Sequence, residues 1–224
     1  MKEENLNIAQ TKQPEDISNS GRVFSYGFGV RKQYDIITAD PPWQQGKGGQ
    51  KKVRLNSSGG ELEYPTVNFA EIKNLLQRAF GEYGAENLNV FVWTIDKYLT
   101  ETDLMLEGFG YRRHARLVWD KVTGIPAAFT IRYAHEYLLW YYKGKFQPIA
   151  EEYRGKFTTV FREQVKRHSQ KPECVFEFLS KIYPNKTKLE LFARPYSEMF
   201  EKREGWDVWG NEVASDINLA PQYP

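Results

Sequence analysis

Apolar runs and apolar residues at helical spacing alternate along most of the chain. Between residues 34 and 38 the apolar character is nearly continuous, which is typical of a central strand covered on both faces. From 68 to 83 apolar side chains recur every three or four positions, which predicts an amphipathic helix. The same two patterns predict strands at 87–95, 114–119, 135–142, 158–161, 188–193 and 206–210, and helices at 98–107 and from 172 to a stop at 183.

This alternation predicts an α/β fold with a mostly parallel twisted sheet and helices on both faces. In such sheets ligands bind beyond the carboxyl ends of the strands. Asp40 follows one predicted strand and Arg194 follows another, so we expect the two side chains to share one crevice.

The two ends of the chain lack this patterning. Residues 1–21 are rich in Asn, Gln, Lys and Glu, which predicts a mobile tail or a target-specific arm. Residues 214–224 form a second, polar tail. We therefore expect one domain at residues 22–213.

The composition narrows the class of protein. With 224 residues, 41% of them hydrophobic and 15% aromatic, the chain can bury one sizeable core. It has no apolar run of about 18 residues and no apolar core of a signal peptide, so we expect a cytoplasmic protein without a membrane partner. The lone Cys174 excludes internal disulfides, and the three histidines have no metal-site spacing, so no metal is expected.

A net charge of +2 permits nucleic-acid binding without requiring it, so the position of the positive charges matters. Residues 44–62 form a glycine-rich stretch that carries four of these charges, Lys47, Lys51, Lys52 and Arg54. One interpretation is a poorly ordered, solvated insertion. The other is a substrate loop that clamps phosphates, in which case log K would fall with log salt at a slope of roughly −3 to −4.

The motif Asp40-Pro41-Pro42-Trp43 closes the first strand and suits a definite chemistry. An exocyclic amine on a nucleobase is a poor nucleophile because its lone pair is delocalised into the ring. The Asp40 carboxylate and the Pro41 carbonyl could accept its two hydrogens and free that lone pair. Trp43 would then stack on the base, a contact worth about 1–3 kcal/mol. The alternative is that Pro-Pro is only a rigid exit from the sheet, with Asp40 accepting a local backbone hydrogen bond.

Several further motifs follow in a fixed order. They are Tyr64, Trp93, Trp119-Asp120-Lys121, His135-Glu136, His168-Ser169-Gln170-Lys171-Pro172-Glu173, Glu190-Leu191-Phe192-Ala193-Arg194-Pro195, and Gly205-Trp206 followed by Trp209-Gly210-Asn211-Glu212. Over about residues 34–213 this order resembles the MT-A70 family of S-adenosylmethionine-dependent adenine-N6 methyltransferases. The resemblance implies a Rossmann-like methyltransferase fold with the target-amine motif placed before the cofactor-binding strand.

The resemblance also implies S-adenosylmethionine as the cofactor. Lys171, at the start of a predicted helix, can offer its ammonium and the first N–H groups of that helix to the cofactor's carboxylate. Asp40 is similar to the family residue that also reaches the cofactor's amino group, and the planar fork of Arg194 suits ribose or carboxylate oxygens. The other cofactor positions implied are Glu190, Phe192, Tyr196, Ser197, Asn211 and Glu212. On spacing alone, Lys171 could be a surface lysine and Arg194 an ion-pair partner.

Two departures from the family concern the cofactor. Eukaryotic messenger-RNA members usually carry a His-Asn pair where this chain has Tyr196-Ser197, which can still form hydrogen bonds. Those members also carry an Asp-Ile pair before the Asp-Pro-Pro motif, and no match to it is found here. The cofactor's adenine must then be held in another way.

Tyr64 and Glu136 match family positions at the acceptor pocket. Tyr64 could bracket the base opposite Trp43, and Glu136 could accept a hydrogen bond from the base or orient a loop. Without the resemblance, Tyr64 before Pro65 could equally be an apolar staple at a helix entry.

The activity implied by the resemblance is transfer of a methyl group to adenine N6. DNA is favoured as the substrate because a compact domain without an added RNA-binding module resembles the phage and bacterial members. The alternatives are an RNA adenine-N6 methyltransferase and a non-catalytic nucleic-acid-binding subunit. We expect a monomer or a homodimer.

Overall fold

The computed structural model describes residues 31–44, 68–122, 131, 133–166, 170–200 and 202–219, all within the compact unit Arg31–Pro224. Several predictions fall outside these residues and stay predictions. They concern the tail at 1–21, the basic residues Lys47, Lys51, Lys52 and Arg54, and the positions Tyr64 and His168.

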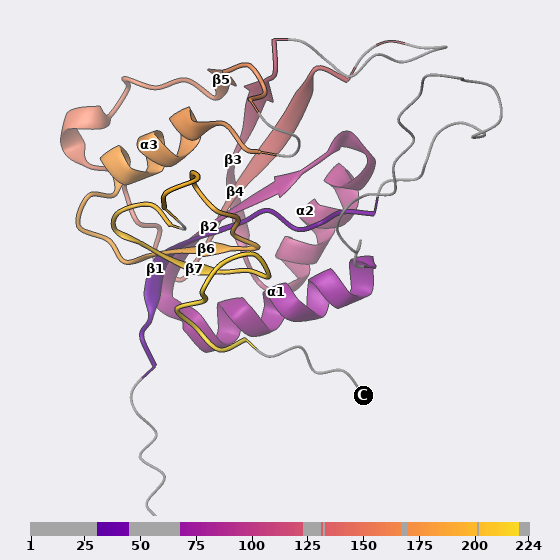
Figure 1. Cartoon of the computed structure of the whole chain (residues 1–224). Helices are drawn as coiled ribbons and strands as arrows, with labels where there is room; N and C mark the ends of the chain where they lie inside the picture. The colour runs from indigo at the N-terminus through magenta and orange to yellow at the C-terminus, as the bar shows by residue number, and fades with distance from the viewer. Residues whose placement is uncertain are drawn as a thin grey trace, which may run out of the picture. The chain divides into compact units, whose positions relative to one another are not determined.

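Strands and helices alternate along the described residues, as the apolar pattern predicted (Figure 1). The strands are β1 (Tyr34–Ala39), β2 (Gly84–Thr94), β3 (Arg112–Asp120), β4 (His135–Lys143), β5 (Val160–Arg162), β6 (Lys188–Leu191) and β7 (Trp206–Trp209). The α-helices are α1 (Phe69–Tyr83), α2 (Leu99–Gly108) and α3 (Glu173–Ile182), with 3-10 turns η1 (Asp96–Tyr98) and η2 (Glu151–Tyr153). No helix of the described residues is both long and apolar enough to cross a membrane.

The seven strands form one sheet in the order β5-β3-β4-β2-β1-β6-β7. The predicted α/β class is confirmed, but the sheet is mixed. Strand β4 runs antiparallel to both of its neighbours, whereas the other pairings within this sheet are parallel. Strands β3 and β4 are consecutive in the chain and adjacent in the sheet, an arrangement that antiparallel strands reach without a crossover helix.

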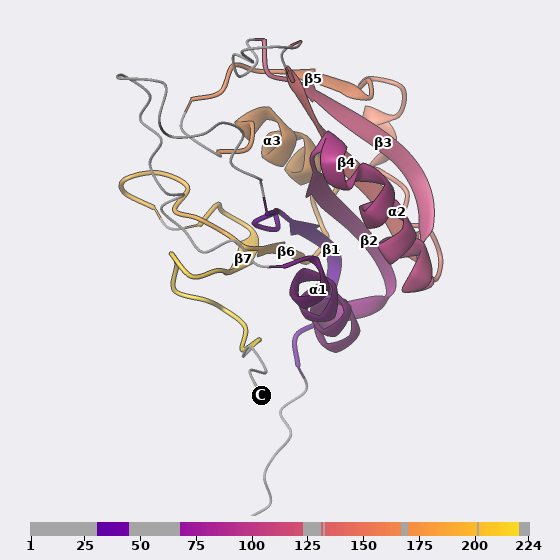
Figure 2. The same cartoon turned by 90° about the vertical axis from the view of Figure 1, so that its right-hand side faces the viewer.

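Helices cover both faces of the sheet (Figures 1 and 2). Apolar residues of α1 and α2 pack on one face, against side chains such as Ile37 and Val90. Apolar residues of α3 pack on the other face, against side chains such as Ile36 and Phe91. Neighbouring residues of one strand therefore enter opposite cores, as the alternation of side chains along a strand requires.

The strand order of the sheet reverses at β1. Helix α1 leads to β2 on one side of β1, whereas β6 and then β7 lie on its other side. Open sheets bind ligands where the strand order reverses in this way, in the crevice outside the carboxyl ends of the strands. The carboxyl ends of β1 and β6 therefore define where the site should lie.

Candidate active site

The ends of β1, β6 and β7 are tied together by the backbone. Asp40 donates its N–H to the Leu191 carbonyl at 3.3 Å, and Ala193 donates to the Trp209 carbonyl at 2.9 Å. Gly210 passes so close that a Cβ there would lie 2.2 Å from the carbonyl oxygen of Ala193. Only glycine permits this approach, which brings the segments after β6 and β7 together.

These segments border a pocket of about 50 Å³. Its walls are the Asp40-Pro41-Pro42-Trp43 motif, Trp93, Thr94 and Ile95 from the end of β2, and the side chains of Glu136, Lys171 and Arg194. The crevice expected from the sequence therefore exists, and it holds both Asp40 and Arg194. Glu136 reaches it because β4 runs antiparallel, so that the start of β4 lies beside the end of β3.

A chain of opposite charges crosses this pocket. The Lys171 ammonium lies 2.8 Å from an Asp40 oxygen and 3.2 Å from a Glu136 oxygen. The other Glu136 oxygen binds the Lys121 ammonium. Lys171, Glu136 and Lys121 each expose 12–13% of their side chains, so these ion pairs are largely shielded from solvent. The Lys171 ammonium also lies 5.6 Å from the centre of the Trp93 ring.

Burial and the neighbouring charges set the protonation states of the side chains in this row of ion pairs. Burial raises the pKa of the Asp40 carboxyl, and Glu136 adds to this, against the pull of Lys171 and Arg194. For Glu136, burial favours a higher pKa, but Lys171 and Lys121 outweigh it and hold the pKa below its ordinary value. For Lys171, burial favours a lower pKa, but Asp40 and Glu136 hold the pKa above its ordinary value, so the ammonium keeps its charge.

The proline and tryptophan of the motif have additional structural roles. The Pro41 carbonyl accepts the Trp43 N–H at 2.8 Å, which leaves one of its two lone pairs for another donor. Trp43 is only 6% exposed, stacks on Phe69 and Tyr98, and donates from its indole N–H to the Trp93 carbonyl. Trp43 therefore anchors the motif to the core, and base stacking on its ring remains a prediction.

Two of the implied cofactor positions have unusual local structure. Phe192, directly after β6, has a φ of 61° in the left-handed region, which is rare for a bulky side chain and recurs at functional sites. Its ring packs edge-on against Trp209 at the end of β7. Arg194 forms an ion pair with Glu212 at 3.6 Å, so the structure joins two positions that are distant in the sequence.

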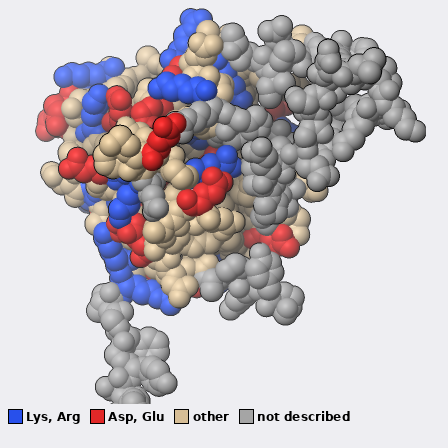
Figure 3. Space-filling view, viewed as in Figure 1, with Lys and Arg blue, Asp and Glu red and all other residues tan. Residues whose placement is uncertain are grey.

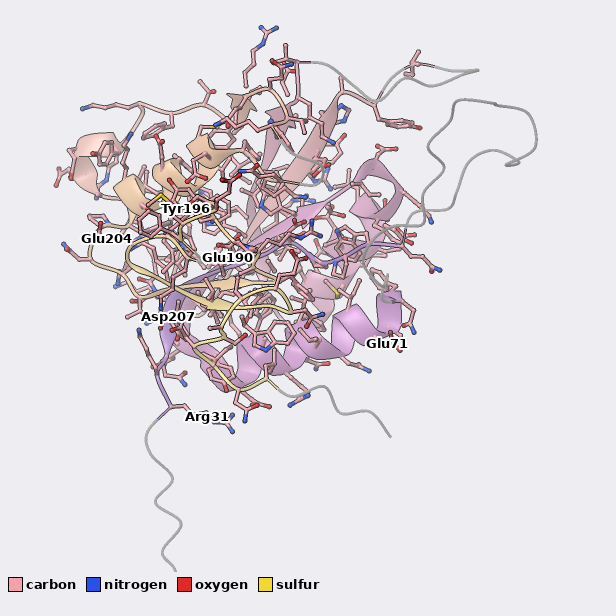
Figure 4. All side chains as sticks on the ribbon, in the orientation of Figure 1. Arg31, Glu71, Glu190, Tyr196, Glu204 and Asp207 are labelled. Carbon is pink, nitrogen blue, oxygen red and sulfur yellow. The ribbon has the colours of Figure 1, made fainter. Side chains whose placement is uncertain are left out.

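The remaining implied positions lie around the same segments. Glu190 in β6 pairs with Arg203 at 3.0 Å, and the Tyr196 ring lies 4.9 Å from the Arg203 guanidinium. The hydroxyl oxygen of Ser197 accepts the N–H groups of Met199 and Phe200 and so closes a local turn. Asn211 is exposed. Figure 4 labels Glu190 and Tyr196, which come from β6 and from the loop after it.

Sequence reasoning gave no role to three residues that matter here. Lys121 stood in a quoted motif, but only the fold shows that it binds Glu136. Trp93 ends a buried strand and lines the pocket, and its indole N–H has no hydrogen-bond partner among the described residues. Arg203 lies in a loop without periodicity, where no sequence signal marks its ion pairs.

A family model described as MT-A70 matches residues 34–212. The match contains each of the segments that form the pocket.

The chain belongs to the MT-A70 family.

Relatives with known names agree with this assignment. The chain is 29% identical over 199 residues to the Type II methyltransferase M.MunI of Mycoplasma sp, covering 82% of this chain and 79% of that protein. It is 27% identical to the probable N(6)-adenosine-methyltransferase MT-A70-like of Oryza sativa subsp. japonica, covering 85% of this chain and 24% of that protein. It is 22% identical to the human N(6)-adenosine-methyltransferase catalytic subunit METTL3, covering 81% of this chain and 28% of that protein. The chain therefore spans only about a quarter of the length of these two eukaryotic relatives.

The pocket suits part of an S-adenosylmethionine molecule. Its buried ammonium and carboxylates match a ligand end that carries both a carboxylate and an ammonium group. A volume of about 50 Å³ is far below the roughly 300–1,000 Å³ of pockets that enclose whole ligands of this size. The charges of the described pocket therefore suit the amino-acid end of the cofactor, and the surrounding side chains must move apart to admit it.

Proposed function

We propose that this protein transfers a methyl group from S-adenosylmethionine to the N6 amine of adenine in DNA. One observation carries the proposal. Asp40, at the tip of the central strand, faces Lys171 and Glu136 in a shielded pocket that Arg194 also borders. The Asp40 carboxylate can accept amine hydrogens and the Lys171 ammonium can bind a carboxylate. Both groups therefore lie together at the edge of the sheet where β1 ends.

The residues around the pocket have separate roles in binding the cofactor. Lys171 binds the cofactor's carboxylate, and Arg194, Phe192, Asn211 and Glu212 border the path of its nucleoside part. When bound, S-adenosylmethionine supplies a methyl group on a positively charged sulfur, which leaves as a neutral thioether. These assignments extend the Rossmann-like methyltransferase arrangement in which the strand ends hold the cofactor.

The Asp40 carboxylate and the free lone pair of the Pro41 carbonyl oxygen accept the two N6 hydrogens. This localises the electron pair of the amine on its nitrogen. With the amine held in this way, N6 would be the nucleophile for the methyl group that the bound cofactor would supply. The surplus N6 proton then passes to Asp40 or to water. Fixed acceptors and orientation supply most of the rate enhancement, so no strong general base is required.

We assign the orientation of the acceptor base to Glu136, because its side chain borders the same pocket as Pro41 and Trp43. In a duplex the target base must leave the helix, at a cost of a few kcal/mol that other contacts must offset. On the face that Figure 3 shows, basic side chains are intermixed with acidic ones and form no single basic patch. The predicted contacts of Lys47, Lys51, Lys52 and Arg54 with phosphates therefore remain the leading source of that offset.

DNA is favoured over RNA because the chain covers 79% of a protein named as a Type II methyltransferase, against about a quarter of the N(6)-adenosine-methyltransferases. A non-catalytic subunit is disfavoured because Asp40 and Lys171 are both present and paired. Whether the protein acts as a monomer or a homodimer stays a prediction.

One experiment separates these alternatives. The protein is incubated with methyl-labelled S-adenosylmethionine and matched DNA and RNA oligonucleotides, single and double stranded, and N6-methyladenine is quantified. We expect label in adenine of DNA. Label in RNA alone would favour the RNA enzyme, and cofactor binding by calorimetry without label in any substrate would overturn the catalytic proposal.

A further inference from the structure

Arg203, in the loop between β6 and β7, makes contacts with several segments that lead to the pocket. Its guanidinium donates two hydrogen bonds to Glu173, at 2.9 and 2.8 Å, and a third to Glu190 at 3.0 Å. It lies 3.6 Å from the centre of the Phe176 ring and 4.9 Å from that of Tyr196. Only 12% of the side chain is exposed.

The partners of Arg203 belong to the segments that carry the cofactor residues. Glu173 is the first residue of α3, two positions after Lys171. Glu190 lies in β6 opposite Thr38 of β1, two positions before Asp40. Tyr196 follows Arg194 by two positions. One guanidinium thus joins the start of α3, the centre of the sheet and the loop after β6.

The other ion pairs of the described part of the loop after β6 do not involve α3, because Lys202 pairs with Asp207 and Asp216, and Arg194 pairs with Glu212. The apolar side chains Met199 and Phe200 of this loop are 82% and 59% exposed, so they contribute little burial. A hollow of about 920 Å³ lies beside the loop, and Arg203 forms part of its wall. The Ser197 turn stabilises the tip of the loop only locally. The contacts of Arg203 therefore carry much of the tie between the loop and α3.

We infer that Arg203 is a positioning residue that sets the affinity of this protein for S-adenosylmethionine, by holding the start of α3 against the strand ends. The inference rests on the proposed function. Because the fork of an arginine binds a carboxylate through two parallel hydrogen bonds and stacks on aromatic rings, lysine cannot replace it. Loss of the fork frees the backbone that carries Lys171, and misplacement by about 1 Å can cost on the order of 10²-fold.

The charge of Arg203 also affects the pKa of Glu190, which offers a second measurement of its role. Burial raises the pKa of Glu190 to about 7; Arg203 opposes this, whereas the carboxylates of Asp40 and Glu173 add to it. Among the described residues, these three charged groups act most strongly on Glu190, and they come from the loop before β7, the end of β1 and the start of α3. Without the guanidinium, the pKa of Glu190 rises further. Arg203→Lys keeps this positive charge and Arg203→Gln removes it, so the two variants separate the loss of the fork from the loss of the charge.

The test compares Arg203→Lys and Arg203→Gln with the wild-type protein and with Arg154→Gln. Arg154 is the matched control, because it is an arginine in an exposed ion pair with Glu151 at the 3-10 turn η2. Folding is checked by circular dichroism, the dissociation constant of S-adenosylmethionine is measured by calorimetry between pH 6 and 9, and kcat and KM are measured with DNA.

We expect Arg203→Lys to weaken cofactor binding about tenfold or more, with a smaller change in kcat. Arg203→Gln should weaken it further and move the pH profile to higher pH, whereas Arg154→Gln should match the wild type. A folded Arg203→Lys variant with wild-type affinity and pH profile would overturn the inference, even if Arg203→Gln fails to fold. Wild-type protein that binds no S-adenosylmethionine would instead overturn the proposed function.

Discussion

Two polar clusters lie at opposite ends of the same strands. At the start of β1, Asp35 accepts from Gln147 and from Thr187, and Asn89 donates to the Gln147 carbonyl and the Tyr183 hydroxyl. At the end of β1, Asp40, Lys171, Glu136 and Lys121 form ion pairs. We call these the amino-end cluster and the carboxyl-end cluster.

The clusters differ in what their partners are. In the amino-end cluster many partners are backbone groups, such as the carbonyl of Gln147 and the N–H of Thr187. Backbone groups cannot swing away, so this cluster holds the fold. In the carboxyl-end cluster the partners are charged side chains from separate elements beside a cavity. Charged side chains beside a cavity can exchange partners with a ligand, so the proposed chemistry belongs to the carboxyl end, whereas the amino end stabilises the fold.

The largest expected effect is on turnover at the carboxyl end. Asp40→Ala should lower kcat about 10²–10³-fold or more, because it removes an acceptor that is fixed at the amine in the transition state. The free energy of unfolding should change little, because Lys171 keeps Glu136 as a partner. The measurement is label transfer at saturating cofactor, with urea unfolding as the control. Turnover within threefold of wild type would contradict the role of Asp40.

The next effect is on cofactor binding. Lys171→Met should weaken S-adenosylmethionine binding about 10–100-fold, by loss of a charge-assisted contact worth about 1.5–3 kcal/mol. Lys186→Met is the matched control, since Lys186 forms its ion pair with Asp35 of the amino-end cluster. Cofactor affinity is measured by calorimetry. Equal losses in both variants would contradict the prediction that only the carboxyl-end cluster contributes to cofactor binding.

A stability effect should appear at the amino end. Asn89→Ala removes the side chain that binds both Gln147 and Tyr183 in a fully buried position. Leaving those groups unsatisfied should lower the free energy of unfolding by about 1–3 kcal/mol. Urea unfolding measures this loss, and calorimetry on the folded variant should give wild-type cofactor affinity. A weakened cofactor affinity at unchanged stability would reverse the assignment of this cluster.

The smallest effect concerns pH. Burial raises the pKa of Glu190 from 4.5 to about 7 in the folded protein. As the pH rises from about 4.5 to 7, the unfolded chain has already released this proton while the folded protein still holds it, so the free energy of unfolding falls and then levels off. Glu190→Gln should flatten this fall by about 1–2 kcal/mol between pH 5 and 8, below the roughly 3 kcal/mol of the full shift, because the folded protein relaxes. The measurement is urea unfolding of the wild type and of Glu190→Gln at pH 5 and 8. The same change in the free energy of unfolding in the two proteins would contradict this prediction.

Much of the fold followed from local pattern. The helix expected at 68–83 begins at an Asn68 cap that is completed by Glu71, and each predicted strand has a counterpart in the structure. The meeting of Asp40 and Arg194 followed from the rule that strand ends share one edge. The resemblance of the ordered motifs to the MT-A70 family is confirmed by the match over residues 34–212, and the roles of the individual residues await the experiments above.

The parts that were not predicted depend on tertiary contacts. The direction of β4 is not encoded in its apolar pattern, yet it decides that Glu136 enters the pocket. The burial of Trp43 depends on Phe69 and Tyr98, which approach only in the folded sheet. Arg203 could not be singled out because its partners lie 13 and 30 positions away in the chain.

The pairing of β1 with β6 has a consequence for synthesis of the protein. Asp35 and Thr187, which lie side by side at the start of these strands, are 152 positions apart. A nascent chain on the ribosome therefore carries Asp40 long before it carries Lys171, Arg194 or the strand that completes the central pairing. A polypeptide released early would lack Lys171 and Arg194, so it would hold only part of the pocket that Asp40 borders.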